Sequence, residues 1–283
     1  MVTATTSPNE LNNGRASVDE ERRPVTVPDF LAAKARGVRL TLLTAYDYTM
    51  ARLFDAAGVD GLLVGDSLGM VVQGHEHPLG VTLEETIYHT RCVARGLRHS
   101  LLISDLPFMT YQISAQQALE SAGRLIKEGG THAVKLEGGV RSTAHIAAIT
   151  RADIPVMGHI GMTPQSVRCY GGFRVQRDAD KIIEDALAVE QAGAFAVVLE
   201  CIPLELAQRV TAQLRIPTIG IGAGAACDGQ ILVAHDMLGL YDDFRPRFVK
   251  QFANLGRDVA CAVENYCREV RDGTFPAAQH AFR

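Results

Sequence analysis

Eight short apolar segments recur along the chain, and their alternation with helical patterns is the feature that most restricts the fold. The segments are 40–47, 61–67, 101–107, 133–139, 155–161, 196–202, 217–224 and 230–237. Amphipathic stretches of helical period separate most of them and often end in glycine, as at 82–96, 114–130 and 178–193. Apolar strands that alternate with helices predict βαβ units and a parallel sheet.

Eight such units within 283 residues predict an α/β fold, a (β/α)8 TIM barrel formed as a single domain. An open doubly wound sheet is the alternative, because only a short linker separates the seventh and eighth segments. We assign residues 25–283 to the barrel domain. This domain includes a helical pattern from about Phe244 to Val270, which either closes the barrel or faces another subunit. Residues 1–24 hold too few apolar side chains to form a core, so we predict a disordered tail.

The composition is that of an ordinary globular protein, with 47% hydrophobic and 21% charged residues. The mild net charge of −4 gives no reason to expect a nucleic-acid partner. No apolar segment approaches the roughly 18 residues of a membrane span, and the N-terminus has no signal-peptide core. The six cysteines form no C-x-x-C pair, which favours reduced thiols over zinc or disulfides. We therefore predict a cytoplasmic protein whose partners include neither nucleic acid nor a membrane.

Nearly every apolar segment ends in a polar or ionisable residue. These residues are Asp47, Asp66, Asp105, Glu137, His159, Glu200 and Asp236. In a barrel the carboxyl ends of the strands lie together at the mouth, where barrel enzymes carry their chemistry. A single acid in this position can also be a turn or cap residue, which is the interpretation we prefer for Asp47 and Asp236. Several carboxylates on one rim repel one another, so we expect a bound cation, and their oxygen ligands favour Mg²⁺.

Lys135 and Glu137 stand two positions apart in the segment 133–139, so they project from the same face of a strand. Burying both charges is costly unless each has a partner. From the residues alone, two interpretations stay open. The two side chains form a structural ion pair with each other, or each of them binds a metal or a charged ligand.

Two further features also allow more than one interpretation. Glu200 could project into the mouth or cap a helix that begins near Pro203, and by alternation the neighbouring Cys201 should point to the opposite face. The glycine-rich segment 220–224 could cradle a phosphate or allow close packing near a ligand.

Taken together, these motifs resemble the ketopantoate hydroxymethyltransferase family, which is also called 3-methyl-2-oxobutanoate hydroxymethyltransferase. The similarity lies in LLVGDS at 62–67, DLPF at 105–108, KLEGG at 135–139, GHIG at 158–161, VLECIP at 198–203 and the stretch 216–240. It covers essentially all of the chain after the tail. The loops 75–85 and 172–180 depart from the family pattern, the second by placing Arg177 where a glycine is familiar.

The resemblance implies a role for each matching residue. One Mg²⁺ per subunit would be bound by Asp66, Asp105 and Glu137. The keto acid 3-methyl-2-oxobutanoate (2-oxoisovalerate) would contact Asp66, Ser67, Asp105 and Lys135, with His159 nearby. Glu200 would be the proton acceptor. Family members are decamers of two pentameric rings, which implies a homodecamer.

The implied reaction is a step of pantothenate and coenzyme A biosynthesis. It moves a hydroxymethyl group from the co-substrate 5,10-methylenetetrahydrofolate to the keto acid, through a Mg²⁺-stabilised enolate, and yields 2-dehydropantoate (ketopantoate). The residue chemistry agrees, because loss of the C3 proton needs a carboxylate base and nearby positive charge. A C–C lyase or mutase acting on a related acid is the nearest alternative. A barrel that has lost catalysis would instead show broken site residues, and all of them are present.

Overall fold

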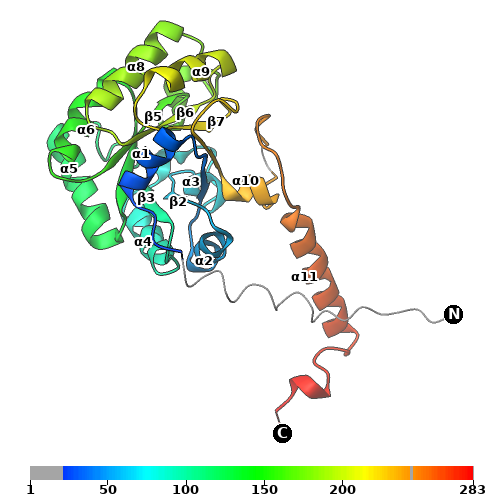
Figure 1. Ribbon diagram of the computed structural model, residues 1–283. Coiled ribbons are helices and arrows are strands. Elements are labelled where there is room, and N and C mark those ends of the chain that lie inside the picture. The colour runs from blue at the N-terminus through cyan, green and yellow to red at the C-terminus, as the bar shows by residue number, and fades with distance from the viewer. Residues whose placement is uncertain (1–21, 243–244, 283) are drawn as a thin grey trace.

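The computed structural model describes residues 22–242 and 245–282. Eight parallel strands pair in chain order, and the last pairs with the first, so the sheet is closed (Figure 1). The strands are β1 (Leu40–Thr44), β2 (Gly61–Val64), β3 (Leu101–Asp105), β4 (Ala133–Glu137), β5 (Val156–Gly161), β6 (Ala196–Glu200), β7 (Thr218–Ile221) and β8 (Gly229–Leu232). The predicted (β/α)8 barrel is confirmed, and the open-sheet alternative is wrong.

Helices cover the outside of the barrel between most strands (Figure 1). The longer ones are α2 (Tyr48–Ala57), α4 (Leu83–Ala94), α5 (Ala115–Arg124), α6 (Thr143–Thr150), α8 (Ala179–Gln191) and α9 (Leu204–Gln213). The short helices α3 (Leu68–Val71), α7 (Val167–Tyr170) and α10 (Ala234–Leu238) lie in the loops at the mouth. β8 follows β7 directly, without a helix between them. The eighth apolar segment is therefore half strand and half helix, because its second part forms α10.

Strand β4 shows how alternation sorts side chains between the two faces of the sheet. Val134 and Leu136 pack into the hydrophobic layer under the helices, whereas Ala133 belongs to the cluster inside the barrel. Lys135 and Glu137 share the face of Ala133 and are almost fully buried. Both charges therefore project into the upper interior, as the two-residue spacing predicted.

Helix α1 (Val27–Arg36) closes the opposite end of the barrel. Phe30 is fully buried and meets the ring of Phe195 edge-on at 5.8 Å. The helix begins after Thr26, whose backbone N–H donates to the carboxylate of Asp29 at 2.8 Å. Apolar side chains fill this floor, and the cavity described below opens at the other end, at the carboxyl ends of the strands.

The predicted C-terminal helix is shorter than its sequence pattern suggested. Phe244 lies outside the described residues, and helix α11 runs only from Leu255 to Arg271. Pro246 disfavours helix in the residue before it, and the side chain of Asn254 accepts a hydrogen bond from Arg257 N at the true start. The helix extends away from the barrel (Figure 1) and buries none of its residues. It does not close its own barrel, which corrects one of the two roles that we considered.

Most of the predicted tail, up to residue 21, lies outside the described residues, so its disorder stays a prediction. In the part of the chain that the structure describes, no helix combines the length and the apolar character that a membrane crossing requires.

Candidate active site

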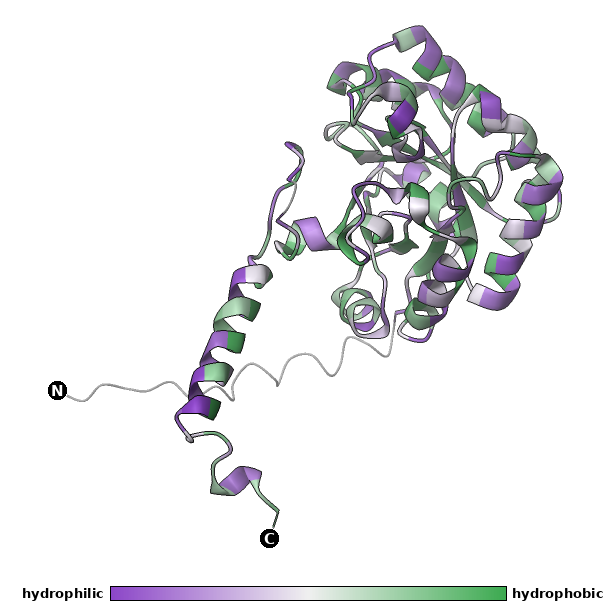
Figure 2. Ribbon diagram, turned by 180° about the vertical axis from the view of Figure 1, so that it is seen from behind, coloured by the Kyte–Doolittle hydropathy of each residue, from purple (hydrophilic) through white to green (hydrophobic). Residues whose placement is uncertain are grey.

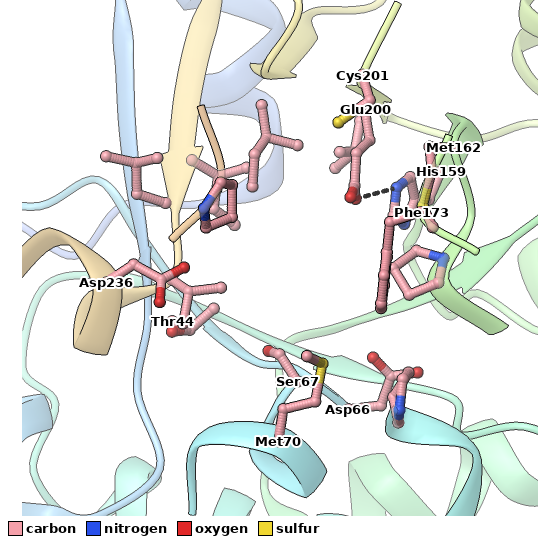
Figure 3. A pocket seen from close by; sticks show the side chains of 18 of the residues that line it. Thr44, Asp66, Ser67, Met70, His159, Met162, Phe173, Glu200, Cys201 and Asp236 are labelled. Atoms are coloured by element: carbon pink, nitrogen blue, oxygen red, sulfur yellow. Dashed lines mark ion pairs between the residues drawn. The ribbon is translucent and has the colours of Figure 1, made fainter. Parts of the chain in front are cut away.

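A cavity of about 350 Å³ opens at the carboxyl ends of the strands. All the predicted site residues line it: Asp66, Ser67, Asp105, Lys135, Glu137, His159 and Glu200. Figure 3 shows Glu200 and His159 on one side of the cavity, with Asp66 and Ser67 along its lower edge. The structure thus brings together side chains from five different strand ends, as expected for a barrel mouth.

Lys135 forms its ion pair with Asp105 and not with Glu137. Its Nζ lies 2.8 Å from Asp105 Oδ1, and both side chains are at most 5% exposed. Burial disfavours the charged lysine, but Asp105 and Glu137 outweigh that effect and raise its pKa. Lys135 Nζ also lies 3.1 Å from His159 Nδ1. Of the two interpretations of the 133–139 segment, the structural pair between Lys135 and Glu137 is therefore wrong.

Glu200 stands at the end of β6 and contacts His159, whose Nε2 is 3.0 Å from Glu200 Oε2 (Figure 3). Burial raises the pKa of Glu200 to about 8, although Lys135 opposes the shift. Burial, together with the charge of Lys135, lowers the pKa of His159 well below its ordinary value. His159 is therefore neutral at physiological pH, and a carboxylate with a pKa near the working pH suits a general base.

The remaining carboxylates form an under-neutralised cluster. Burial raises the pKa of Asp66 to about 7, and repulsion from Asp105 is the second-largest cause of this shift. Burial and the charge of Asp66 likewise raise the pKa of Glu137 well above its usual range. With Glu200 there are four carboxylates around one lysine, so a further cation would stabilise the site.

Mg²⁺ fits this donor set. Among the described residues, no three Asp, Glu, His or Cys side chains already converge on one metal position. Mg²⁺, however, is commonly held by one or two carboxylates, with waters and substrate oxygens as its other ligands. Hard oxygen donors that carry excess negative charge are suited to such an ion.

Ser67 and Asp66 are held by hydrogen bonds to neighbouring elements. Tyr46 Oη and Ser67 Oγ are 2.8 Å apart, and the backbone N–H of Asp66 donates to Asp105 Oδ2 at 3.0 Å. His89 on α4 contacts the carbonyl oxygen of Tyr46 at 2.7 Å. Asp66 and Ser67 are thereby held in place from the ends of the two neighbouring strands, β1 and β3.

Gln165 is a site residue that the sequence reasoning missed. Its Nε2 donates to Asp66 Oδ2 at 2.8 Å, and its backbone N–H donates to Glu137 Oε2 at 3.0 Å. Its Oε1 lies 2.9 Å from Tyr111 Oη, which also contacts the backbone of Glu137. One buried residue thus orients two of the predicted metal ligands, Asp66 through its side chain and Glu137 through its backbone N–H. Gln165 lies in the loop TPQS (163–166) after β5, and the sequence of this loop does not distinguish it from an ordinary turn.

The cap interpretation of Glu200 is wrong, and so is the predicted direction of Cys201. Helix α9 begins after Pro203 without any side-chain cap. Cys201 lines the cavity because β6 ends at Glu200 and the next residue turns with a φ of +48°. Burial raises the pKa of its thiol to about 12, so it is a neutral wall residue and not a nucleophile.

The glycines of segment 220–224 serve close packing. Gly222 has a φ of +64°, and a Cβ on it would lie 2.8 Å from the ring of Phe248. A Cβ on Gly224 would meet the side chain of Leu204. Of the two open interpretations of this segment, the contacts favour packing at the mouth.

Asp47 and Asp236 have different roles, although the sequence suggested one role for both. Asp47 is confirmed as a cap, because its Oδ1 accepts the N–H of Met50 at 2.9 Å at the start of α2. Asp236 forms no cap and lines the cavity instead.

Apolar side chains of Leu63, Val198 and Ile231 form another part of the cavity wall. The cavity is therefore both charged and apolar, which suits a small acid with a branched hydrocarbon end.

Comparison with known proteins is consistent with this site. The sequence model of one family, described as Ketopantoate hydroxymethyltransferase, matches residues 24–278. A protein of Pelobacter propionicus named 3-methyl-2-oxobutanoate hydroxymethyltransferase is 54% identical over 94% of this chain and 100% of its own length. A protein of the same name from Clostridium novyi is 55% identical, over 91% of this chain and 95% of its own.

Among solved structures, 2,3-dimethylmalate lyase, a member of the PEP mutase/isocitrate lyase superfamily, resembles this chain with a TM-score of 0.57. The match covers 90% of this chain and 91% of the lyase at 16% identity. At that identity the similarity extends to the barrel alone, so it does not favour the lyase alternative.

Proposed function

The chain belongs to the ketopantoate hydroxymethyltransferase family, and from that membership and the site geometry we propose the following function. The enzyme transfers a hydroxymethyl group from 5,10-methylenetetrahydrofolate to 3-methyl-2-oxobutanoate, yielding 2-dehydropantoate for pantothenate and coenzyme A biosynthesis. The observation that carries the proposal is the buried carboxylate of Glu200. It has a pKa of about 8 and lies in one cavity with Lys135 and three further carboxylates.

Lys135 and Ser67 bind the anionic end of the keto acid. Lys135 Nζ is the buried cation nearest the carboxylate cluster, and Ser67 Oγ is held in place by Tyr46 Oη. The branched hydrocarbon end then contacts the apolar wall that includes Leu63 and Val198. This orientation directs C3 of the keto acid into the cavity and excludes water from it.

In this proposal Asp66, Asp105 and Glu137 would hold one Mg²⁺ per subunit, directly or through its bound waters. When bound, the ion supplies positive charge beside the keto and carboxylate oxygens of the substrate. Gln165 keeps the carboxylates of Asp66 and Glu137 in position through the two hydrogen bonds that it donates.

Glu200 takes the C3 proton, and the electron pair of that C–H bond moves toward the keto oxygen. His159, which is neutral, adjoins the Glu200 carboxylate, with its Nε2 3.0 Å from Glu200 Oε2. C3 then forms a bond to the methylene carbon of the folate, and one C–N bond of that carbon breaks. Water supplies the hydroxyl group as the second C–N bond breaks, which releases tetrahydrofolate. General-base assistance of this kind is typically worth about 10²–10⁴-fold in rate.

We also propose that the enzyme works as a homo-oligomer, the family's decamer, in the cytoplasm. Val259, Val263, Tyr266 and Val270 form one stripe on α11 and are each at least 44% exposed. Figure 2 shows hydrophobic and hydrophilic segments alternating around this helix. Because α11 buries none of its residues against its own barrel, a second copy of the chain is the natural partner for the apolar stripe. All six cysteines are free, as in a reducing compartment.

A hydrogen-exchange experiment tests the proposed chemistry. The protein is mixed with 3-methyl-2-oxobutanoate and Mg²⁺ in deuterated water without folate, and the C3 proton is followed by NMR. We expect exchange that requires metal and is lost in Glu200→Gln but not in the matched control Glu205→Gln, which changes an exposed residue of α9. Absence of exchange in the wild type with metal bound would refute the base assignment. Failure to form 2-dehydropantoate after adding methylenetetrahydrofolate would refute the proposed reaction.

A further inference from the structure

Asp236 is a buried carboxylate whose position in the cavity is fixed. It belongs to α10, directly after β8, and is only 9% exposed. The helix is tied to β1 by the N–H of Ala234, which donates to Thr44 Oγ1 at 3.0 Å, and it ends at Gly239 with a φ of +64°. Figure 3 shows Asp236 beside Thr44, across the cavity from Glu200 and His159.

The carboxylate of Asp236 has no hydrogen bond or ion pair with any residue in 22–242 or 245–282. Asp47, at the end of β1, differs because the N–H of Met50 satisfies its carboxylate. Burial raises the pKa of Asp236 to about 6. Asp236 lines the cavity and its carboxylate has no protein donor there among the described residues, so a ligand that supplies N–H groups would satisfy its oxygens.

The keto acid is not that ligand. It is an anion, and a second carboxylate beside it would repel it, whereas Lys135 stands on the Asp105 side of the site. The co-substrate has the complementary chemistry. A reduced pterin carries a ring N–H next to an exocyclic amino group, and these two parallel donors match the two oxygens of a carboxylate.

The cavity mouth has further features that suit this ligand. Phe173 and Phe248 line it with partly exposed rings, which can pack against a flat bicyclic ligand. Arg174 and Arg247 lie next to them in the sequence, also line the cavity and are exposed. They suit the carboxylates of a glutamate tail that leaves the cavity.

We propose that Asp236 binds the pterin of the one-carbon donor by accepting hydrogen bonds from its ring N–H and its exocyclic amino group. This inference rests on the proposed function for the identity of the donor. It gives the rim two subsites, one on the β2–β6 side for the keto acid and one at β8 for the folate.

The first test is kinetic and uses Asp236→Asn, which keeps the side-chain shape but turns one acceptor into a donor. We expect the KM for methylenetetrahydrofolate to rise by about 10- to 100-fold, the usual effect of losing one or two ligand hydrogen bonds. The folate-free, Mg²⁺-dependent exchange at C3 of the keto acid should keep its wild-type rate. Asp47→Asn is the matched control and should leave the folate KM unchanged. Loss of the exchange reaction in Asp236→Asn would overturn the proposal, because Asp236 would then act on the keto acid.

The second test measures binding without turnover, so it decides the question even if the proposed reaction fails. Tetrahydrofolate is compared with an analogue in which a methyl group replaces the exocyclic amino group. Wild-type protein should bind the analogue at least about 10-fold more weakly, since one donor to Asp236 is missing. Asp236→Asn should bind both ligands with similar affinity. Equal binding of the two ligands by the wild type, or undiminished discrimination in the variant, would refute the assignment. Circular dichroism of the variant establishes that it is folded.

Discussion

Replacing Lys135 by Met removes the cation at the centre of the carboxylate cluster while keeping most of the side-chain volume. Lys135 Nζ lies 2.8 Å from Asp105 Oδ1. At an effective dielectric constant of about 20 this contact corresponds to about 6 kcal/mol of Coulomb energy. The neighbouring carboxylates respond by taking up a proton, so the net loss should be near the roughly 3–5 kcal/mol of a broken buried pair.

This loss should depend on pH in a definite direction. Lys135 lowers the pKa values of Asp66, Glu137 and Glu200, so without it these values in the folded state rise further above their unfolded values. A group with a raised folded pKa contributes stability at low pH and loses it as the pH rises. The difference in unfolding free energy between wild type and Lys135→Met should therefore be larger at pH 8 than at pH 5. Urea unfolding at the two pH values measures it.

Ligand binding separates Lys135 from Glu137. In Lys135→Met, the keto acid should bind at least about 30-fold more weakly, because a desolvated charge pair with the ligand is lost. Mg²⁺ should bind no more weakly than in the wild type, since a neighbouring positive charge has been removed. Glu137→Gln should instead weaken Mg²⁺ binding. Calorimetric titration with each ligand provides the test. If Lys135→Met lost Mg²⁺ affinity and kept keto-acid affinity, the assignment of roles would be wrong.

Three further predictions concern the metal site and the assembly. Without Mg²⁺, thermal stability should fall from pH 5 to pH 8. The pKa is raised to about 7 for Asp66 and to about 8 for Glu200, so ionisation of these two groups in this range disfavours the folded state. Mg²⁺ should reduce the fall, and a melting temperature that rises with pH in metal-free protein would contradict this. Gln165→Leu should weaken Mg²⁺ binding by about 10- to 100-fold, because Asp66 loses the donor that orients it. Calorimetry measures this affinity, and an unchanged value would exclude the positioning role of Gln165. Val263→Asp should yield a smaller particle in analytical ultracentrifugation with an unchanged circular dichroism spectrum, and an unaltered particle size would mean that α11 does not mediate assembly.

The barrel and its rim of polar residues could be predicted from the sequence because both follow from periodicity. Eight apolar segments between helical patterns restrict the topology, and parallel strands bring their carboxyl ends to one mouth. Contacts that depend on a loop conformation could not be predicted in this way. Gln165 reaches Asp66 across 99 positions of sequence, and Cys201 turns into the cavity through a single left-handed residue. Neither feature leaves a periodic signal.

Asp47 and Asp236 show where local sequence information ends. Each follows an apolar segment and comes shortly before or within a helix, so the same cap interpretation fits both. What separates them is where the helix starts. Asp47 immediately precedes α2 and reaches the N–H of Met50, whereas Asp236 is the third residue of α10 and projects sideways into the cavity. A shift of a few residues in a helix start thus changes a cap into a ligand-facing carboxylate, and such shifts are beyond the precision of sequence patterns.

The pairing of Lys135 follows from strand register, which a single segment cannot reveal. Residues two apart on one strand are separated by about 6.6 Å, whereas neighbouring strands lie only about 4.8 Å apart. In the barrel Asp105 is the register partner of Lys135, and His159 is the register partner of Glu137. Each charge on β4 therefore meets a residue of an adjacent strand more closely than it meets the other. Because Lys135 is directed toward Asp105, Glu137 keeps its carboxylate for Gln165 and for the proposed metal, and this division makes the two substitutions distinguishable by experiment.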